Sequence, residues 1–334
     1  MRYSLCLSYD GSAFCGWQIQ PASPSVQACL EGVLSRLLGR PVPVTGAGRT
    51  DTGVHAAGYV AHFDYDGILP FAASDFTYKL NAMLPREVVV HSVSPVPDSF
   101  HARFSACRRE YTYFIHRQKD PFLRNTSWLC GYPSLVFEAM NAACQFLLGT
   151  HDFSCFEKSG GDNKTSVCTV YDAFWAPYVP SHLQIMGQEG IPSEIAFASL
   201  RPLPTRNASD DAAVGPSRSG RDCLSPCCPP GDICPSGGGR GWPQISEGTP
   251  SCHESNYWYF RIAADRFLRN MVRATVGTLI EVGRGKHSPE WVAELIATGT
   301  RGDAGESVPG HALFLNKVLY PSDYPGPENT PDHD

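Results

Sequence analysis

The chain has 334 residues, of which 42% are hydrophobic, and a formal net charge of −6 at pH 7. This length and composition predict a globular protein of two compact units with sizeable hydrophobic cores. No stretch approaches the roughly 20 consecutive apolar residues of a membrane span, and the first residues enter a strand pattern without the apolar core of a signal peptide. We therefore expect a cytoplasmic protein that does not enter a membrane. Because phosphate binding depends on Lys and Arg, the acidic balance restricts any nucleic-acid site to a local basic patch.

The first hundred residues alternate strand and helix patterns. Residues 3–9 alternate apolar and polar side chains, which is typical of a strand with one buried face. Apolar side chains at helical spacing from Val26 to Leu37 predict a helix with Gly39 as its C-cap. Further strands are predicted at 41–45, 59–63 and 88–93, with a helix from about Ser74 that ends before Pro85. The order is β-α-β-β-α-β, as in a ferredoxin-like unit.

A similar order returns downstream. Strands are predicted at 110–115, 167–175, 257–263 and 312–319, and helices at 135–148, 267–282 and 289–297. We therefore predict an α+β fold of two ferredoxin-like (RRM-like) halves, residues 1–104 and residues 105–180 with 256–325. The halves are expected to join into one mainly antiparallel sheet with helices on one face and a central cleft.

Residues 181–255 fit neither half. They are rich in Pro, Gly, Ser and Asp, with one short strand pattern at 182–186, and predict a disordered insertion; 326–334 are read as a tail. The insertion holds a group of potential zinc ligands, Cys223, Cys227, Cys228, Cys234, Cys252 and His253, but their spacing lacks a paired C-x-x-C motif. Since the chain has 13 scattered cysteines, an odd number, we expect reduced thiols and no metal.

The nonapeptide from Gly48 to Ala56, Gly-Arg-Thr-Asp-Thr-Gly-Val-His-Ala, places the carboxylate of Asp51 near the guanidinium of Arg49, between two glycines. Strand patterns lead into and away from it, so Asp51 is predicted on a loop. Such a pair is often a plain surface ion pair. The nonapeptide nevertheless resembles the signature of the tRNA pseudouridine synthase A family, G-R-T-D-x-G-V-H-A, whose Asp is catalytic, and it reproduces every specified position.

This resemblance covers residues 1–180 and 256–325. It implies a homodimeric isomerase that converts uridine to pseudouridine at positions 38, 39 and 40 of the tRNA anticodon stem-loop, with one tRNA touching both subunits. The reaction breaks the N1–C1′ bond and joins C5 to C1′, so it needs no cofactor. An ionised Asp51 can attack C1′ or C6 or remove a sugar proton, and the sequence leaves these routes open.

Two arginine positions compete to pair with Asp51, because an opposite charge favours the ionised carboxylate. Arg49 is adjacent, but residues two apart on a loop often diverge, and it is also a candidate for a phosphate contact. Arg266, Arg269 and Arg273 are spaced for one helical face, which is usually just solvated. The family carries a similar segment whose last Arg pairs with the catalytic Asp, so the resemblance favours Arg273 and leaves Arg266 and Arg269 as phosphate contacts.

A flipped pyrimidine needs an aromatic platform. Residues 100–106 and 108–113 offer rings interleaved with arginines. Strand aromatics are nevertheless usually core residues, and on that ground we read Tyr113 and Phe104 as packing. By the resemblance, Tyr111 stacks on the uracil and is a candidate base for the C5 proton. The resemblance also assigns Leu313 to the other side of the base, although a leucine in a terminal strand is more often simply buried. His101 and Arg103 are further candidates for RNA contacts.

His151 and Asp152 are adjacent and are read as a structural loop rather than a catalytic dyad, since neighbouring side chains diverge. No P-loop, nucleophile elbow or dinucleotide fingerprint occurs. Two alternatives remain: a non-catalytic RRM-like RNA-binding protein, which has no use for Asp51, and a related synthase that acts on another RNA.

Overall fold

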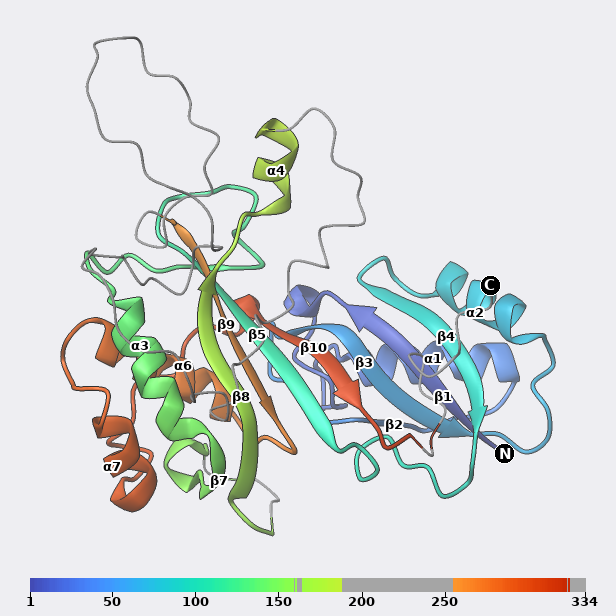
Figure 1. Ribbon diagram of the computed structural model, residues 1–334. Helices are drawn as coiled ribbons and strands as arrows, with labels where there is room; N and C mark the ends of the chain where they lie inside the picture. The colour runs from blue at the N-terminus through green and yellow to red at the C-terminus, as the bar shows by residue number, and fades with distance from the viewer. Residues whose placement is uncertain (159, 161–163, 188–254, 323, 325–334) are drawn as a thin grey trace, which may run out of the picture. The chain divides into compact units, whose positions relative to one another are not determined.

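A computed structural model describes residues 1–158, 160, 164–187, 255–322 and 324. The chain divides into two units, one formed by Met1–Tyr178 with Asn256–Asp334 and one by Val179–Ser255. Most of the second unit, including positions 188–254 of the predicted insertion with the potential zinc ligands, lies outside the described residues, as does the predicted tail, 326–334. The first unit contains all of the strands described below (Figure 1).

The first unit has a mixed α+β fold built on one large, mostly antiparallel open sheet. In the described residues ten strands follow the order β4-β1-β3-β10-β5-β9-β8-β7, with β2 paired to β3 and β6 paired to β5. The pairs β3–β10 and β5–β6 are parallel, and the other pairs are antiparallel. The strands are β1 (Arg2–Tyr9), β2 (Val44–Gly46), β3 (His55–Asp64), β4 (Val88–Val96), β5 (Arg108–His116), β6 (Trp128–Leu129), β7 (Gly149–Asp152), β8 (Val167–Pro177), β9 (Tyr257–Ala264) and β10 (Leu313–Leu319).

Helices pack against both ends of this sheet. In Figure 1, α1 and α2 lie beside β1, β3 and β4, whereas α3, α6 and α7 lie beside β8 and β9. The helices of this unit are α1 (Val26–Leu38), α2 (Ala73–Met83), α3 (Phe137–Cys144), α6 (Met271–Gly283) and α7 (Trp291–Thr298), with short 3₁₀ helices η1 (Gly11–Ala13), η2 (Gln145–Leu147), η3 (Ser154–Phe156) and η4 (Gly310–Ala312).

Local sequence explains the helix ends well in the first half. The Ser25 side chain accepts the N–H of Ala28 at 3.3 Å and caps α1. Gly39 ends that helix in the left-handed conformation with φ 70°, as its C-cap role predicts. The helix expected from Ser74 is α2, and it ends before Pro85.

Two predictions of secondary structure were wrong, and two short strands were missed. The helix expected from 267 begins only at Met271, because Asn270 has φ 65° and an α-helix does not pass through a left-handed residue. The stretch 182–186, expected to be a strand, lies in a helix of the second unit, α4 (Ser181–Gly187), whose first turn forms on the carbonyl of Pro180. The strands β6 and β7 were not predicted at all, since two and four residues are too few to show a period.

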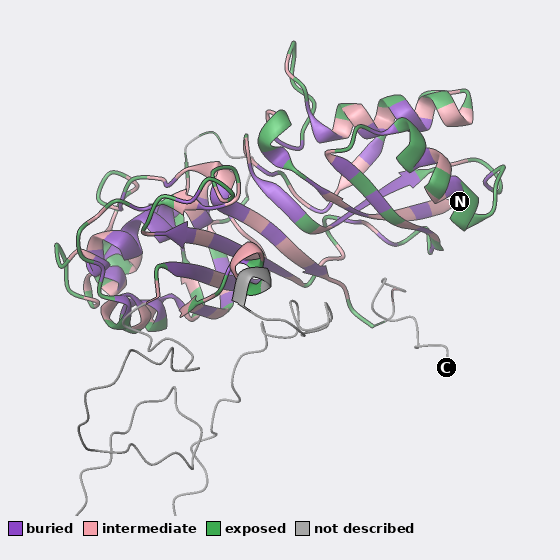
Figure 2. Cartoon of the chain, turned by 90° about the horizontal axis from the view of Figure 1, so that it is seen from above, coloured by how far each residue is buried: buried purple, intermediate pink, exposed green. Residues whose placement is uncertain are grey.

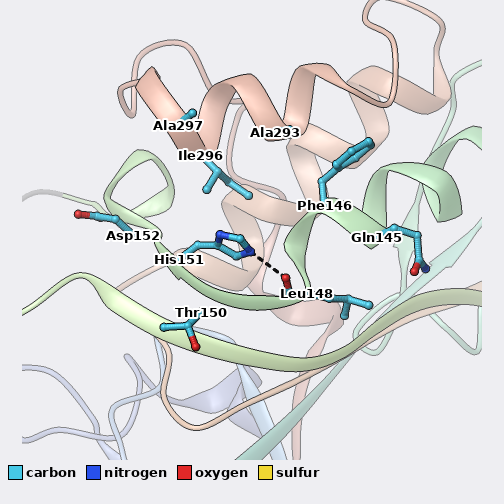
Figure 3. Close-up of a pocket in the computed structure, with 9 residues that line it drawn as sticks. All are labelled: Gln145, Phe146, Leu148, Thr150, His151, Asp152, Ala293, Ile296 and Ala297. Atoms are coloured by element: carbon cyan, nitrogen blue, oxygen red, sulfur yellow. Dashed lines mark hydrogen bonds between the residues drawn. The ribbon is translucent and has the colours of Figure 1, made fainter.

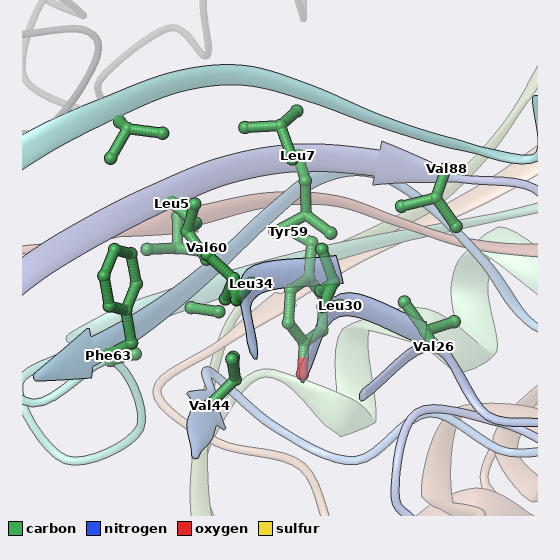
Figure 4. Close-up of a cluster of buried hydrophobic side chains, with 14 of the residues drawn as sticks. Leu5, Leu7, Val26, Leu30, Leu34, Val44, Tyr59, Val60, Phe63 and Val88 are labelled. Atoms are coloured by element: carbon green, nitrogen blue, oxygen red, sulfur yellow. The ribbon is translucent and has the colours of Figure 1, made fainter. Parts of the chain in front are cut away.

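The core of the first half lies between α1, α2 and the sheet (Figure 4). Leu5 and Leu7 of β1 are fully buried and belong to the same cluster as Leu30 and Leu34 of α1 and Phe76 of α2. Figure 2 shows the alternation along the strands, with buried residues interrupted by partly exposed ones. The period of two read from residues 3–9 is therefore the actual burial pattern of β1.

The second half has its own aromatic core. Phe137 of α3 stacks on Trp258 of β9, with ring centroids 3.6 Å apart and planes 6° apart. Trp175 of β8 packs on Phe260 of β9 at 5.3 Å. The two halves meet where β3 runs parallel to β10, with His55 opposite Phe314. This junction brings residues from distant parts of the chain next to the loop that precedes β3.

Candidate active site

The loop between β2 and β3, residues 47–54, is called the Asp51 loop here. Val54 N–H donates to Asp51 O at 3.1 Å, which closes a four-residue turn. Gly53, the third residue of that turn, has φ 77°, a conformation that favours glycine. Asp51 therefore stands at the first position of a tight turn, and its side chain is 35% exposed.

Residues of β1 and of the segment that follows it form hydrogen bonds with this loop. Thr50 is buried, and its Oγ1 lies 2.8 Å from Oη of Tyr9. Trp17 N–H donates to Thr50 O at 3.2 Å. Next to Trp17, Gly16 has φ 95°, and a Cβ there would lie 2.3 Å from Thr50 O. Only glycine allows the two backbones to approach this closely, so the position of Asp51 depends on a residue 35 positions earlier.

Arg273 of α6 pairs with Asp51 across 222 residues of sequence. Its Nη1 lies 3.2 Å from Asp51 Oδ2, and its Nε donates to Val308 O at 2.7 Å. Val308 N–H in turn donates to Arg273 O at 3.3 Å. Because a carbonyl holds one edge of the guanidinium, the other edge is directed at the carboxylate. The Arg273 side chain is 22% exposed, so the pair is partly shielded from water.

Tyr111, Tyr113 and Leu313 share one face of the sheet. In the antiparallel pair of β5 and β10, Tyr113 lies opposite Leu313 and Tyr111 lies opposite Leu315, and directly opposite residues point to the same side. Tyr113 is fully buried, and its Oη donates to Pro309 O at 3.0 Å, which agrees with a packing role. Leu313 is also buried, with 5% of its surface exposed.

Charges of the ion pair act on both tyrosines. Burial, opposed by the charge of Arg109 and assisted by that of Asp51, raises the pKa of Tyr111 to about 12. Burial likewise raises the pKa of Tyr113, and the nearby charge of Arg273 opposes that rise. The Tyr111 phenol is therefore protonated at neutral pH. Its ring meets the edge of Phe267 at 5.0 Å, and this contact fixes its plane.

The other arginines predicted near Asp51 lie on the Asp51 loop and on the segment before α6. Arg49 is exposed on the Asp51 loop. Arg266 and Arg269 lie on the segment between β9 and α6, so the expectation of one helical face shared with Arg273 was wrong. The carboxylate of Asp265 accepts the N–H of Arg266 at 2.7 Å and that of Thr169 at 2.8 Å, so the start of this segment is tied to β8. Both side chains nevertheless lie on the segment that leads into α6.

His101 and Arg103 lie on a compact turn between the two halves, residues 101–105, called the 101–105 turn here. Arg103 is exposed and His101 is half-buried. Phe104 does not pack in the core, contrary to our expectation, since 75% of its surface is exposed. The reason is that the turn gives its inward positions to other residues, among them Ala102, which is fully buried.

Arg109 is a residue of the site region to which the sequence reading gave no role. It is buried, with 9% exposed, and binds three backbone carbonyls. Its Nη1 donates to Asp265 O at 2.7 Å, and its Nη2 donates to Ala47 O at 3.0 Å and to Arg103 O at 2.7 Å. One side chain thus joins the Asp51 loop, the 101–105 turn and the segment before α6. One feature of the sequence could have pointed to Arg109. It is a charged residue at a position that a strand pattern places in the core.

His55 is a second residue of the site region to which the sequence analysis gave no separate role. Its ring is buried and stacks on Phe314 at 4.5 Å. Nε2 lies 2.9 Å from both Asn125 O and His311 O, and Nδ1 faces Gly11 N–H and the Asp10 carboxylate, both at 3.1 Å. Carbonyls only accept, so Nε2 carries a proton. The ring ties the end of the Asp51 loop to three other segments.

A pocket of about 580 Å³ lies away from these residues, between η2, β7 and α7 (Figure 3). His151 and Asp152 line it, and they lie in strand β7 rather than in the loop that we expected. His151 Nε2 is 2.7 Å from Leu148 O, and Asp152 Oδ1 accepts the N–H of Ser154 at 2.9 Å. Each side chain is therefore engaged with backbone of its own segment.

The described residues contain no group of three His, Cys, Asp or Glu side chains placed to hold a metal ion. The eight cysteines in these parts of the chain are free thiols. Among the helices that the structure describes, none is both long and apolar enough to cross a membrane.

Comparison with known proteins connects this geometry to a reaction. A family model described as tRNA pseudouridine synthase matches residues 5–105 and 143–321. The tRNA pseudouridine synthase A of Parabacteroides distasonis is 38% identical over 326 residues, covering 96% of this chain and 97% of the relative. That of Porphyromonas gingivalis is 35% identical over 322 residues, covering 96% and 98%.

These matches define the chain as an enzyme that isomerises uridine to pseudouridine. It belongs to the tRNA pseudouridine synthase family, and its substrate is tRNA. The family that the sequence resemblance suggested is confirmed, and the alternative of a non-catalytic RNA-binding protein was wrong.

Proposed function

We propose that Asp51 is the catalytic carboxylate and that Arg273 pairs with it and holds it in a fixed orientation. The observation that carries this proposal is the contact of 3.2 Å between Arg273 Nη1 and Asp51 Oδ2, with Arg273 itself fixed by Val308 O. The reaction breaks N1–C1′, forms C5–C1′, moves the C5 proton to solvent and leaves a proton on N1. An ionised carboxylate next to a fixed cation suits attack on C1′ or C6, or removal of a sugar proton.

Tyr111 and Leu313 are proposed to hold the flipped uracil from two sides. Their shared sheet face and the rigid contact of Tyr111 with Phe267 support this role. Since burial raises the pKa of Tyr111 to about 12, its phenol is protonated at pH 7. This favours the stacking role over the role of base for the C5 proton, because a neutral phenol does not readily accept a proton.

Arg49, Arg103, Arg266 and Arg269 are proposed as phosphate contacts, and His101 as a further RNA contact. All five belong to the three segments that meet around Arg109 or Asp51. A local group of cations reconciles tRNA binding with a net charge of −6, since binding depends on the charge near the groove.

We also infer that the two halves, residues 1–104 and residues 105–180 with 256–325, are each ferredoxin-like and leave a central cleft between them. Strand order supports this inference. The first half has the order β4-β1-β3-β2 and the second β10-β5-β9-β8, so in each the fourth, first, third and second strands are neighbours. This is the arrangement that a β-α-β-β-α-β chain adopts when its helices cover one face.

The positions modified are proposed to be uridines 38, 39 and 40 of the anticodon stem-loop, by a cytoplasmic homodimer that needs no cofactor. The relatives named tRNA pseudouridine synthase A support the substrate, and the free thiols support the compartment. Mapping of pseudouridine along unmodified tRNA, with variants that carry a single uridine at 38, 39 or 40, tests this. Pseudouridine at other positions alone would reassign the enzyme to another region of tRNA.

A further inference from the structure

Phe104 is an exposed aromatic ring in a cationic setting. Its exposed fraction is 75%, and its ring centroid lies 4.3 Å from that of His101, with the planes 36° apart. The guanidinium of Arg103 lies 5.6 Å from the centroid of the Phe104 ring. An aromatic face next to an arginine is the arrangement on which proteins stack unpaired bases.

Each backbone N–H of the 101–105 turn, which carries this ring, donates a hydrogen bond. His101 N–H donates to Ser105 Oγ at 3.0 Å, and Ser105 N–H donates to His101 O at 2.9 Å. The N–H groups of Arg103 and Phe104 both donate to His101 Nδ1, at 3.2 and 3.3 Å. Ala102 N–H donates to Nδ1 of the buried His62 at 3.1 Å. The ring is therefore mounted on a rigid turn, and little conformational entropy is lost when a ligand covers it.

The same turn is tied directly to the Asp51 loop. Arg109 Nη2 binds Arg103 O and Ala47 O at once, at 2.7 and 3.0 Å. Tyr320 Oη donates to Ala102 O at 2.7 Å and holds the turn from its other side. The 101–105 turn and the first residue of the Asp51 loop are therefore bound by the same guanidinium nitrogen.

We propose that Phe104, flanked by His101 and Arg103, stacks on an unpaired base of the tRNA that is not the target uridine. The ligand is a single-stranded nucleotide close to the target, and its identity is not read, since every base offers a stacking face. The proposal rests on the proposed function, because it requires the target uridine to bind at Asp51. The platform would hold the strand after the target base has left its stack.

The test compares Phe104→Leu and Phe104→Tyr with the matched control Tyr78→Leu, whose side chain on α2 is also 75% exposed. Stacking contributes about 1–3 kcal/mol per base, so Phe104→Leu should raise the Kd for unmodified tRNA by about 5- to 150-fold. Phe104→Tyr keeps an aromatic ring and should therefore bind tRNA with the Kd of the parent. Tyr78→Leu should also leave this Kd unchanged. At saturating tRNA, kcat should change little, because the ring touches no reacting atom.

A fluorescent base gives a second readout that a structural role would not move. 2-Aminopurine is placed one position at a time in the nucleotides around the target uridine, and stacking on Phe104 should quench one of them in the parent but not in Phe104→Leu. Equal Kd values for parent and Phe104→Leu, or a Kd that Phe104→Tyr does not restore, would overturn the proposal. Failure of the proposed function is distinguishable, since it would appear as modification outside the anticodon stem-loop by the parent itself.

Discussion

Arg109 offers the sharpest test of how the site is held together. Arg109→Lys keeps the positive charge but replaces a planar fork with a single nitrogen, which cannot occupy the positions of both Nη1 and Nη2. The three carbonyls it binds belong to Ala47, Arg103 and Asp265. In Arg109→Lys at least one of these carbonyls must therefore lose the hydrogen bond that it accepts from residue 109.

The size of the effect follows from these contacts. Hydrogen bonds to charged groups contribute about 1.5–3 kcal/mol each, and leaving a buried carbonyl unpaired carries a similar cost. We predict that Arg109→Lys lowers the free energy of unfolding by about 2–4 kcal/mol. We also expect a lower kcat, because Ala47 O anchors the start of the Asp51 loop.

Urea unfolding at constant pH measures the change. Arg86→Lys is the matched control, because the Arg86 side chain is 94% exposed and should respond by less than about 0.5 kcal/mol. If Arg109→Lys unfolds at the same urea concentration as Arg86→Lys and keeps full activity, the three carbonyl contacts do not organise the site.

Two further predictions concern Arg273 and His62. Arg273→Lys cannot hold Val308 O and Asp51 together, so single-turnover conversion of tRNA should slow by at least about 10-fold with little change in tRNA affinity, and a rate within twofold of the parent would contradict this. Burial, with smaller contributions from Arg2 and His101, lowers the pKa of His62 to about 4 from an unfolded value of about 6.5. The unfolded chain therefore takes up a proton first as pH falls, and about 3 kcal/mol of stability should be lost between pH 6.5 and pH 4. Urea unfolding at pH 7 and pH 4.5 should show a smaller loss in His62→Asn than in the parent, and an equal loss in both would exclude His62 as the cause.

Local patterns predict most of the secondary structure because period and capping are local properties. The alternation of residues 3–9 and the glycine at 39 correspond to β1 and to the end of α1. The start of α6 was placed wrongly because Asn270 adopts a left-handed conformation that an apolar period does not reveal. Its side chain donates to Ser307 Oγ at 2.6 Å, a contact with a residue 37 positions later.

The residues of the candidate site, too, could be predicted from the sequence only in part. The Asp51 motif is contiguous, so a sequence reading finds it, whereas the choice of Arg273 over Arg49 needed the family resemblance. The role of Arg109 could not be read, because its three partners are backbone carbonyls from distant segments and carry no residue signature. Phe104 was assigned to the core because an aromatic before a strand usually packs, and only the fold shows that Ala102 takes the inward position.

The most direct test of the catalytic assignment is tritium release from C5-labelled uridine in unmodified tRNA. Asp51→Asn keeps the size of the side chain and removes its charge, and Asp66→Asn, whose side chain is 95% exposed, is the matched control. We predict release by the parent and by Asp66→Asn, and none by Asp51→Asn although it still binds tRNA. Release by Asp51→Asn at the rate of the parent would contradict the central claim that the Asp51 carboxylate performs the reaction.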